Sequence, residues 1–316
     1  MKLTGVFLIE TGVVNRGDGI GNIATVKKIT TQDGVKVYFS PQSYKRALWN
    51  NLQKNYNWAK PLVTRDGGVV QRTGSIIDSE EFDFAGTMIA KPKYQRDSVL
   101  YVDQGISINN FSGDMEFMTN MGIAKLYGEN EANIINRENF YGIYLLPFGI
   151  ELYRIGFQEI SEIDLEFEIK DSNETKIKKI YEKLNIKIDD ENKIKDWAKK
   201  VKLITKENKK IIINLAEEEK KKRITDLLNA MGELGRQIEG SERNLSPYFA
   251  VFSLDYATPK YLLFLKDKLR ERKKITENDI QQYAKNDGKN IIIATHENYR
   301  AQITELIDKI KFEEDK

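Results

Sequence analysis

The sequence contains no cysteine. A chain without thiols forms neither a disulfide framework nor a thiolate metal site, and it has no cysteine nucleophile. Its single histidine, His296, follows the apolar run 290–295, which reads as the end of a strand. Histidine-based metal sites and most acid–base triads need partners that this chain lacks, so we expect a loop or capping role for His296.

Long apolar runs are also missing. No run approaches the roughly 18–20 residues that a membrane-spanning helix needs. The first residues contain one lysine and a short apolar strand, which is not the pattern of a signal peptide. We therefore expect a cytoplasmic protein that has no membrane partner.

Excess charge of one sign is absent as well. The chain has 316 residues, and its 50 Lys and Arg against 48 Asp and Glu give a formal net charge of +2. This balance argues against a uniformly basic coat, so any nucleic-acid-binding surface must be local. A hydrophobic fraction of 40% is enough for a substantial core.

Hydrophobic periodicity predicts regular elements near the N-terminus. Residues 2–10 read as an inner strand, and residues 23–30 and 35–39 read as a hairpin around the turn Gln32-Asp33-Gly34. Residues 41–55 have the spacing of an amphipathic helix that opens on Ser40. Residues 60–136 are less regular and glycine-punctuated, which indicates a largely β or irregular insertion.

The rest of the chain alternates between strands and helices. From about residue 170 to 223 it is dense in Lys and Glu with helical spacing, which favours a solvated helical surface over an RNA patch. The remaining predictions are strands at 139–157, 246–256 and 289–295 and helices at 257–275 and 298–310. These units predict an α+β fold with one antiparallel sheet backed by helices, because a doubly wound parallel sheet needs more regular alternation.

The helix that opens on Ser40 is a candidate phosphate site. A helix N-terminus carries unpaired N–H groups and a partial positive charge. Its first turns also contain Gln42, Ser43, Lys45 and Arg46, which suit the backbone of a polyanion. A capped helix with solvated charges explains the same residues equally well.

Residues 90–98 are a second candidate. Lys91, Lys93 and Arg96 surround Tyr94 on an extended segment. Cations for phosphates and a ring for a base suit a single-stranded nucleic acid, whereas the alternative is an ordinary surface turn. Arg137, just before the strand at 139–157, is similar in character.

Four segments in sequence resemble a known family: MKLTGVFLIE with ATVKKITTQDG and FSPQSYKRAL, then FDFAGTMIAKPKYQRDSVLYV, then GDMEFMTNMG, then RENFYGIYLLPF. They look like the DevR-like backbone subunit of type I-B CRISPR interference (Cascade) complexes. The match covers most of residues 1–155 and becomes diffuse afterwards.

The resemblance implies a modified ferredoxin-like, or RRM-like, palm with inserted finger and thumb-like elements. In these terms the chain is one elaborated domain with a core from 1–59, 137–168 and 245–316. Residues 60–136 form a finger-like lobe, and residues 169–244 form a charged helical insertion.

The resemblance also implies a function. It predicts a non-catalytic subunit without metal or cofactor that binds CRISPR RNA and polymerises head to tail with copies of itself. Target DNA and other Cascade subunits are the further partners expected.

The resemblance adds further site residues. In the loop after the first strand it implies RNA contacts at Asn15, Asn22, Lys27 and Lys28. The glycines of this loop fit neither the dinucleotide-binding nor the P-loop pattern. Residues 231–247 look like the family's Gly-rich segment and place Arg236, Gln237 and Arg243 on the RNA, although ELGRQIEGSE stands where the family has small residues.

Two other functions remain open. Asp97, Asp103, Asp114 and Glu116 lie among glycine-rich loops and suit Mg²⁺ in a ribonuclease of the kind found in type III complexes. A transcriptional or developmental regulator would need a reader of duplex DNA, and the sequence has no helix-turn-helix signature.

Overall fold

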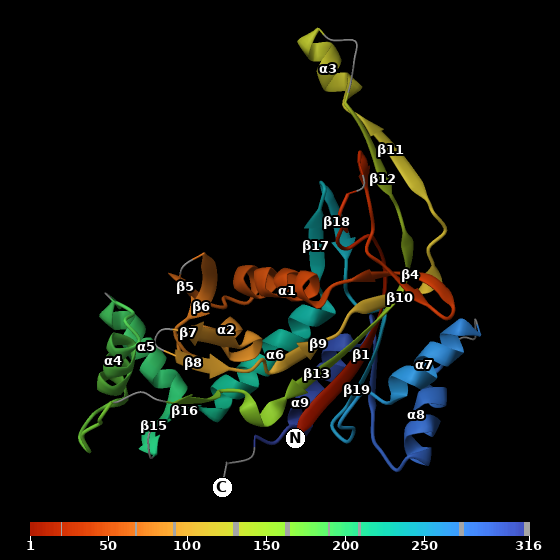
Figure 1. Ribbon diagram of the computed structural model, residues 1–316. Coiled ribbons are helices and arrows are strands. Elements are labelled where there is room, and N and C mark those ends of the chain that lie inside the picture. Colours follow the sequence, from red (N-terminus) through yellow and green to blue (C-terminus); the bar gives the residue numbers. More distant parts are fainter. Residues whose placement is uncertain are drawn as a thin grey trace.

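The computed structural model describes residues 1–19, 21–66, 68–90, 93–128, 133–161, 165–188, 190–207, 210–271 and 275–312. Its centre is an antiparallel sheet in the order β20-β19-β1-β13-β10-β4-β3, with β9 also paired to β13 (Figure 1). The strands of this sheet are β1 (Lys2–Gly12), β3 (Lys28–Thr31), β4 (Gly34–Phe39), β9 (Leu100–Val102), β10 (Gly105–Asn110), β13 (Tyr141–Glu151), β19 (Phe249–Ser253) and β20 (Ile292–Thr295).

The strand order confirms the predicted fold class. Helix α1 (Pro41–Asn55) connects the β1 region to β10, and α6 (Glu217–Gly232) lies between β13 and β19 in the chain. Strand β1 lies between β19 and β13 in the sheet. This is the strand–helix–strand–strand–helix–strand arrangement of a ferredoxin-like, or RRM-like, core.

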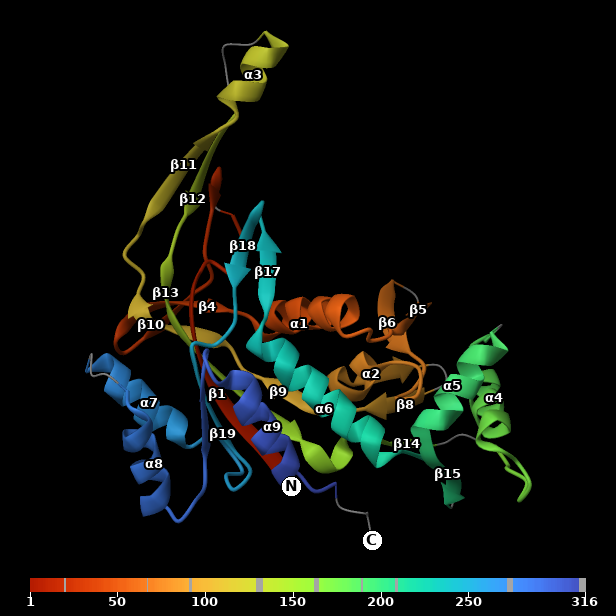
Figure 2. The same cartoon turned by 180° about the vertical axis from the view of Figure 1, so that it is seen from behind.

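Helices cover the sheet on both faces, which explains why β1 is apolar nearly throughout. Leu3, Phe7 and Ile9 point into a core shared with α1, α6 and α9 (Tyr299–Lys309). Val6 and Leu8 point into a second core with α7 (Tyr261–Arg270) and α8 (Glu277–Asn286). Figure 2 shows α9 in front of β1, and α6 packs beside α9.

Close packing against β13 explains why position 5 on β1 is a glycine. It stands opposite Phe148 on β13, and a Cβ at this position would lie 2.2 Å from the Phe148 ring. The ring fills the space over the strand and packs against Phe7 at a centroid distance of 4.7 Å. A larger residue at position 5 would therefore push this aromatic cluster apart.

A side lobe, residues 62–96 and 157–215, packs beside the sheet around its own apolar core. Its β14-β16-β15 sheet lies against α4 and α5, and the segment 62–96 supplies two hairpins and α2. The elements of this lobe are β5 (Leu62–Asp66), β6 (Val69–Thr73), α2 (Glu80–Ala85), β7 (Thr87–Ala90), β8 (Lys93–Arg96), β14 (Phe157–Ser161), α4 (Asn173–Lys183), α5 (Glu191–Lys200), β15 (Val201–Glu207) and β16 (Lys210–Leu215). The 3₁₀ helix η1 (Leu152–Arg154) lies between β13 and β14 in the chain.

A long projection leaves the sheet on the side opposite the chain termini (Figure 1). It consists of β11 (Met115–Thr119), α3 (Met121–Tyr127) and β12 (Ile134–Glu138), and β2 (Ile23–Ala24) pairs parallel to β12. A short hairpin, β17 (Gly235–Ile238) and β18 (Ser241–Asn244), stands next to its base.

The two predicted insertions are organised differently from the sequence expectation. Strands β9 and β10, within the range 60–136, belong to the central sheet, and α6, within 169–244, packs on the main core. Of the remaining described parts, segments of both ranges combine in the side lobe, β11, α3 and β12 form the projection, and β17 and β18 form the hairpin at its base. Among the described helices, none combines the length and apolar character needed to cross a bilayer.

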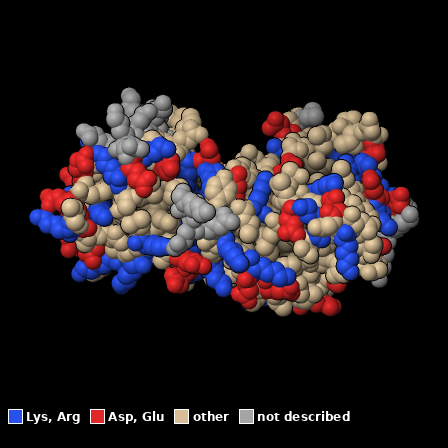
Figure 3. Space-filling model, turned by 90° about the horizontal axis from the view of Figure 1, so that it is seen from below, with Lys and Arg blue, Asp and Glu red and all other residues tan. Residues whose placement is uncertain are grey.

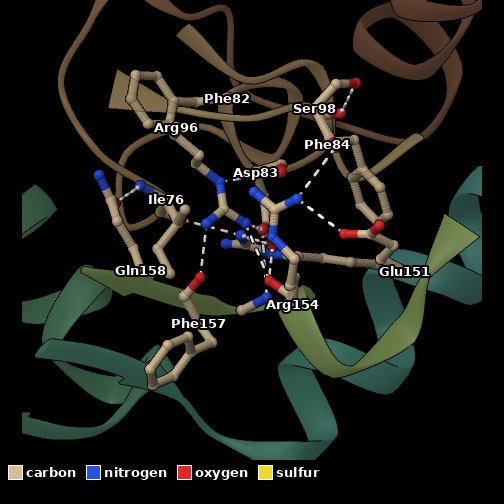
Figure 4. A network of polar contacts seen from close by, with 12 residues as sticks. Ile76, Phe82, Asp83, Phe84, Arg96, Ser98, Glu151, Arg154, Phe157 and Gln158 are labelled. Carbon is tan, nitrogen blue, oxygen red and sulfur yellow. Dashed lines mark hydrogen bonds and ion pairs between the residues drawn. The ribbon is translucent and has the colours of Figure 1, made fainter. Parts of the chain in front are cut away.

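Buried charges join the side lobe to the main core (Figure 4). The Asp83 carboxylate on α2 accepts hydrogen bonds from Arg96 on β8, from Arg223 Nη1 on α6 at 3.0 Å and from the Gly156 amide at 2.9 Å. Arg96 also donates to the Phe157 carbonyl at 2.6 Å. Both ends of each interaction are almost completely removed from solvent.

The pKa values of the two buried guanidinium groups shift in opposite directions. Burial opposes the charged form of Arg223, yet Asp83, Glu80 and Glu219 together raise its pKa. For Arg96 burial is the larger effect and lowers the pKa in spite of Asp83. Because one buried carboxylate pairs with cations from two segments, it links the side lobe to α6.

We expect replacement of Asp83 by alanine to cost about 3–5 kcal/mol of unfolding free energy, because buried Arg96 loses its carboxylate partner and Arg223 retains Glu219 but loses Asp83. Urea denaturation measures the change. The matched control is Asp308→Ala, which removes an exposed pair with Lys221 and should cost less than about 1 kcal/mol. Equal losses of unfolding free energy in the two variants would contradict the role of Asp83 as a buried counter-charge.

The buried carboxyl group of Asp78 should make the stability of the fold depend on pH. Burial raises its pKa to about 7, against hydrogen bonds from Tyr181 and the Ser75 amide that favour the charged form. Since the folded-state pKa exceeds the unfolded one, the contribution of Asp78 to stability is present at acidic pH and is lost as the pH rises through 7.

We therefore expect Asp78→Asn, which mimics the neutral acid, to stabilise the protein relative to wild type at pH 8 by on the order of a few kcal/mol, and much less at pH 4. Unfolding free energies at the two pH values measure this difference. If the difference in unfolding free energy between the variant and the wild type does not grow with pH, ionisation of Asp78 does not destabilise the folded protein.

Candidate nucleic-acid interface

The N-terminus of α1 lies at the foot of the β17–β18 hairpin (Figure 1), and Gln42 in its first turn is exposed. Ser40 caps the helix by accepting from the Ser43 amide at 3.3 Å, and Pro41 occupies the first turn, which contains no acidic residue. The Asn15 side chain accepts from the Ser40 amide at 3.2 Å, so the loop after β1 is fixed to this end of the helix. The remaining first-turn amides provide a positive end without a carboxylate.

Arg236 on β17 reaches the same turn. Its guanidinium donates to the Ser43 carbonyl at 3.0 Å and to the Ser43 hydroxyl. Burial lowers its pKa, and no carboxylate within the described parts of the chain forms an ion pair with it. A half-buried cation next to a helix N-terminus and without a counter-ion is a strong site for an anion.

A groove of about 490 Å³ runs between α1 and the β17–β18 hairpin. Polar and charged side chains dominate it, among them Arg46, Asn50, Lys54, Arg236, Gln237 and Glu242. Gln42, Arg46 and Gln237 are exposed and directed to solvent or to this groove, so the predicted residues of α1 and of the 231–247 segment share one surface.

An arginine junction lies where the hairpin meets the base of the projection; it consists of Arg16, Arg137 and Arg243 with Glu116 and Glu239. Arg16 and Arg137 both bind the Glu239 carboxylate, each with a shortest distance of 3.0 Å. Arg137 also binds Glu116 at 2.8 Å. The surrounding arginines, Arg16 first, lower the pKa of Glu239, although its partial burial acts in the opposite direction.

The other predicted loop residues surround this junction. Lys28 binds Glu138 at 2.5 Å and lies over the Phe111 ring at 4.7 Å. The backbone carbonyl of Lys27 accepts from the Tyr38 amide, and Asn22 is exposed in the turn before β2. Arg243 donates to the Val13 carbonyl at 3.2 Å, which ties the hairpin to the end of β1.

The predictions for Arg96 and Lys45 need correction. Arg96 is buried with Asp83 and cannot contact a ligand at the surface. Lys45 turns inward to donate to the Leu100 carbonyl at 2.6 Å, and burial, with Arg72 nearby, lowers its pKa to about 8. Both side chains satisfy internal acceptors, because their helix and strand face the protein at these positions.

The predicted aromatic platform at 90–98 is also wrong. Tyr94 is buried, and its hydroxyl donates to the Gly74 carbonyl at 2.6 Å. Lys91 lies outside the described residues, and so does the side chain of Lys93. The segment therefore supplies no described cation to the surface that α1 and the hairpin share.

Acidic residues do not gather into a metal site within the described ranges. Glu116, one of the carboxylates considered for Mg²⁺, binds Arg137 instead. His296 lies after β20 with its side chain 70% exposed, in the loop position predicted for it.

Basic residues are concentrated locally and not over whole faces. Figure 3 shows the molecule from the side opposite the projection, where Lys and Arg are interspersed with Asp and Glu. The net charge of +2 thus reflects mixing of the two signs. Arg236 differs from the paired cations of the junction because it has no acidic partner among the described residues.

Comparison with known proteins decides the family. The model of the family described as "CRISPR-associated negative auto-regulator DevR/Csa2" matches residues 3–266. The chain belongs to the DevR/Csa2 family. No curated protein matches it.

Solved structures share the fold of this DevR/Csa2 member at low identity. A chain of a "CRISPR RNA-guided surveillance complex, pre-nicking" is 10% identical with a TM-score of 0.59, covering 98% of this chain and 99% of the other. A chain of a "CRISPR RNA-guided surveillance complex" is 11% identical with a TM-score of 0.53 and the same coverage. The family resemblance inferred from the sequence is confirmed.

Sequence reasoning missed Arg16 and Glu239, although both lie in segments that it singled out. Their partnership joins positions 223 residues apart. The only local signal was the acidic residue in a segment where the DevR/Csa2 resemblance led us to expect small ones.

Proposed function

We propose that the protein is a non-catalytic subunit of a Cascade-type CRISPR surveillance complex that binds CRISPR RNA along its sugar–phosphate chain. The observation that carries this proposal is Arg236, a half-buried guanidinium that has no carboxylate partner among the described residues and lies beside the capped N-terminus of α1. Membership of a CRISPR-associated family and a fold shared with chains of RNA-guided surveillance complexes support it.

The chemistry of the interface favours phosphate over bases. Guanidinium groups and helix N-terminal amides bind phosphate oxygens without regard to sequence. Bases that are not held by protein remain free to pair with target DNA, which is how guided systems obtain sequence specificity. The described residues provide no metal-ligating cluster from which to argue a nuclease.

The projection supports assembly of several copies on one RNA. Its α3 exposes apolar side chains at Ile123 (70%), Leu126 (89%) and Tyr127 (83%). Exposed apolar groups of this density mark a protein contact. We propose that a neighbouring copy contacts this surface of α3, because a head-to-tail contact between unlike surfaces continues into a filament. A nearly neutral chain reduces repulsion between such copies.

Light scattering with single-stranded RNAs of increasing length tests this function. We expect the number of bound copies to rise stepwise with RNA length, whatever the RNA sequence. The double variant Ile123→Ser/Leu126→Ser should bind RNA but need at least about tenfold more protein to reach the same number of copies, because it removes exposed apolar contacts worth more than 1.4 kcal/mol.

Leu263→Ser is the matched control, since Leu263 is 65% exposed on α7, away from the projection. One bound copy at every RNA length would overturn the filament. Preference for duplex DNA would favour a regulator, and Mg²⁺-dependent cleavage of the RNA would favour a ribonuclease.

We expect Arg236→Gln to weaken binding of single-stranded RNA about fivefold, on the order of 1 kcal/mol, because one phosphate contact is lost. The slope of log K against log salt should become shallower by about 0.7. Fluorescence anisotropy at several salt concentrations measures both quantities.

Lys309→Gln is the control for this variant. Lys309 is an exposed cation paired with Glu305 on α9, which lies well below β17 in Figures 1 and 2. Equal losses for the two variants would show that Arg236 contributes only bulk charge.

A further inference from the structure

The turn between β17 and β18 contains an unexpected residue. Ile238 pairs with Ser241, so Glu239 and Gly240 form a two-residue loop, with φ values of 50° and 74°. Such turns require positive φ at both positions and favour Asn, Asp or Gly. The backbone therefore gives no reason for a glutamate here, and the explanation lies in its side chain.

The Glu239 carboxylate receives three N–H donors from two arginines. Arg16 Nε donates to Oε1 at 3.1 Å and Arg16 Nη2 to Oε2 at 3.0 Å, while Arg137 Nη1 donates to Oε2 at 3.0 Å. The Glu239 side chain is 36% exposed, whereas those of Arg16 and Arg137 are 14% and 13% exposed. The anion is thus the accessible member of the cluster.

The two arginines have other partners that hold them in place. Arg16 Nη1 donates to the Glu138 carbonyl, and Arg137 Nε donates to Glu116 at 2.8 Å. If Glu239 moves away, both guanidinium groups stay anchored and three N–H donors converge on one vacated position. Paired guanidinium donors bind carboxylate and phosphate in the same forked geometry.

We propose that Arg16 and Arg137 form a binding site for one phosphodiester of the RNA, which the Glu239 carboxylate occupies until RNA displaces it. The exchange replaces one negative charge by another, so the cluster keeps its charge balance. Arg243 lies on the same hairpin and adds positive charge near the carboxylate. This inference rests on the proposed function and deepens it, because it adds Arg16 to the interface and makes Glu239 a competitor of the RNA.

The exchange has a signature in salt dependence. In the wild type the RNA phosphate replaces Glu239, and the freed carboxylate attracts a cation as the RNA releases one. In Glu239→Gln no carboxylate is freed, so one condensed cation of the RNA is released without replacement. We therefore expect the variant to bind single-stranded oligouridine about three- to tenfold tighter at low salt, with a slope of log K against log salt steeper by about 0.7.

Glu182→Gln is the control, because Glu182 is exposed on α4 in the side lobe, away from the hairpin, and no ion pair involves it among the described residues. It removes the same charge without freeing an arginine, so its salt slope should equal that of the wild type. In Arg16→Gln/Glu239→Gln the gain should disappear. Anisotropy titrations of the full chain measure all of these, and urea midpoints confirm that each variant is folded.

Three results would overturn the inference: weaker binding by Glu239→Gln, a gain no larger than that of Glu182→Gln, or an unchanged salt slope. Any of them would make Glu239 a structural anchor of the hairpin. These results are distinct from failure of the proposed function, in which the wild type itself does not bind oligouridine.

Discussion

The buried carboxylate of Asp83 is the interaction on which the relative positions of the parts depend. It compensates Arg96 and Arg223, which come from the side lobe and from α6. A charge desolvated to this degree tolerates no loose geometry, because removal of Asp83 takes the paired carboxylate away from the buried guanidinium of Arg96. Helix α6 connects this buried ion pair to the candidate interface, because β17 with Arg236 follows it in the chain. The helix ends at Gly232, where the Tyr299 ring leaves no room for a Cβ.

Local sequence signals were sufficient for the elements that build the sheet. The helix expected at 41–55 is α1, with Ser40 as its cap, and the hairpin expected around Gln32-Asp33-Gly34 is β3–β4. The apolar strand at 139–157 contains β13. Periodicity identifies such elements because each one buries a face of its own, and this requirement is visible within a few residues of chain.

The same reasoning failed where the fate of a charged side chain depends on distant residues. Lys45 and Arg96 look like Arg46 in sequence, but only Arg46 is exposed. Lys45 finds the Leu100 carbonyl, and Arg96 finds Asp83, through contacts that exist only after the lobe has folded. The side lobe itself is assembled from segments on either side of β13, so no local pattern predicts its core.

A nearly neutral chain can still bind a polyanion, because what matters is whether its cations are already compensated. Carboxylates pair with Arg137 and Lys28, and these pairs hold the long side chains in single conformations before any ligand arrives. The entropy of ordering them is then lost during folding and not during binding. Arg236 is ordered in another way, because it donates to Ser43 and no carboxylate among the described residues pairs with it. Under the proposed function, acidic residues among the arginines serve to position cations, and local order replaces a large net charge as the means of holding a flexible polyanion.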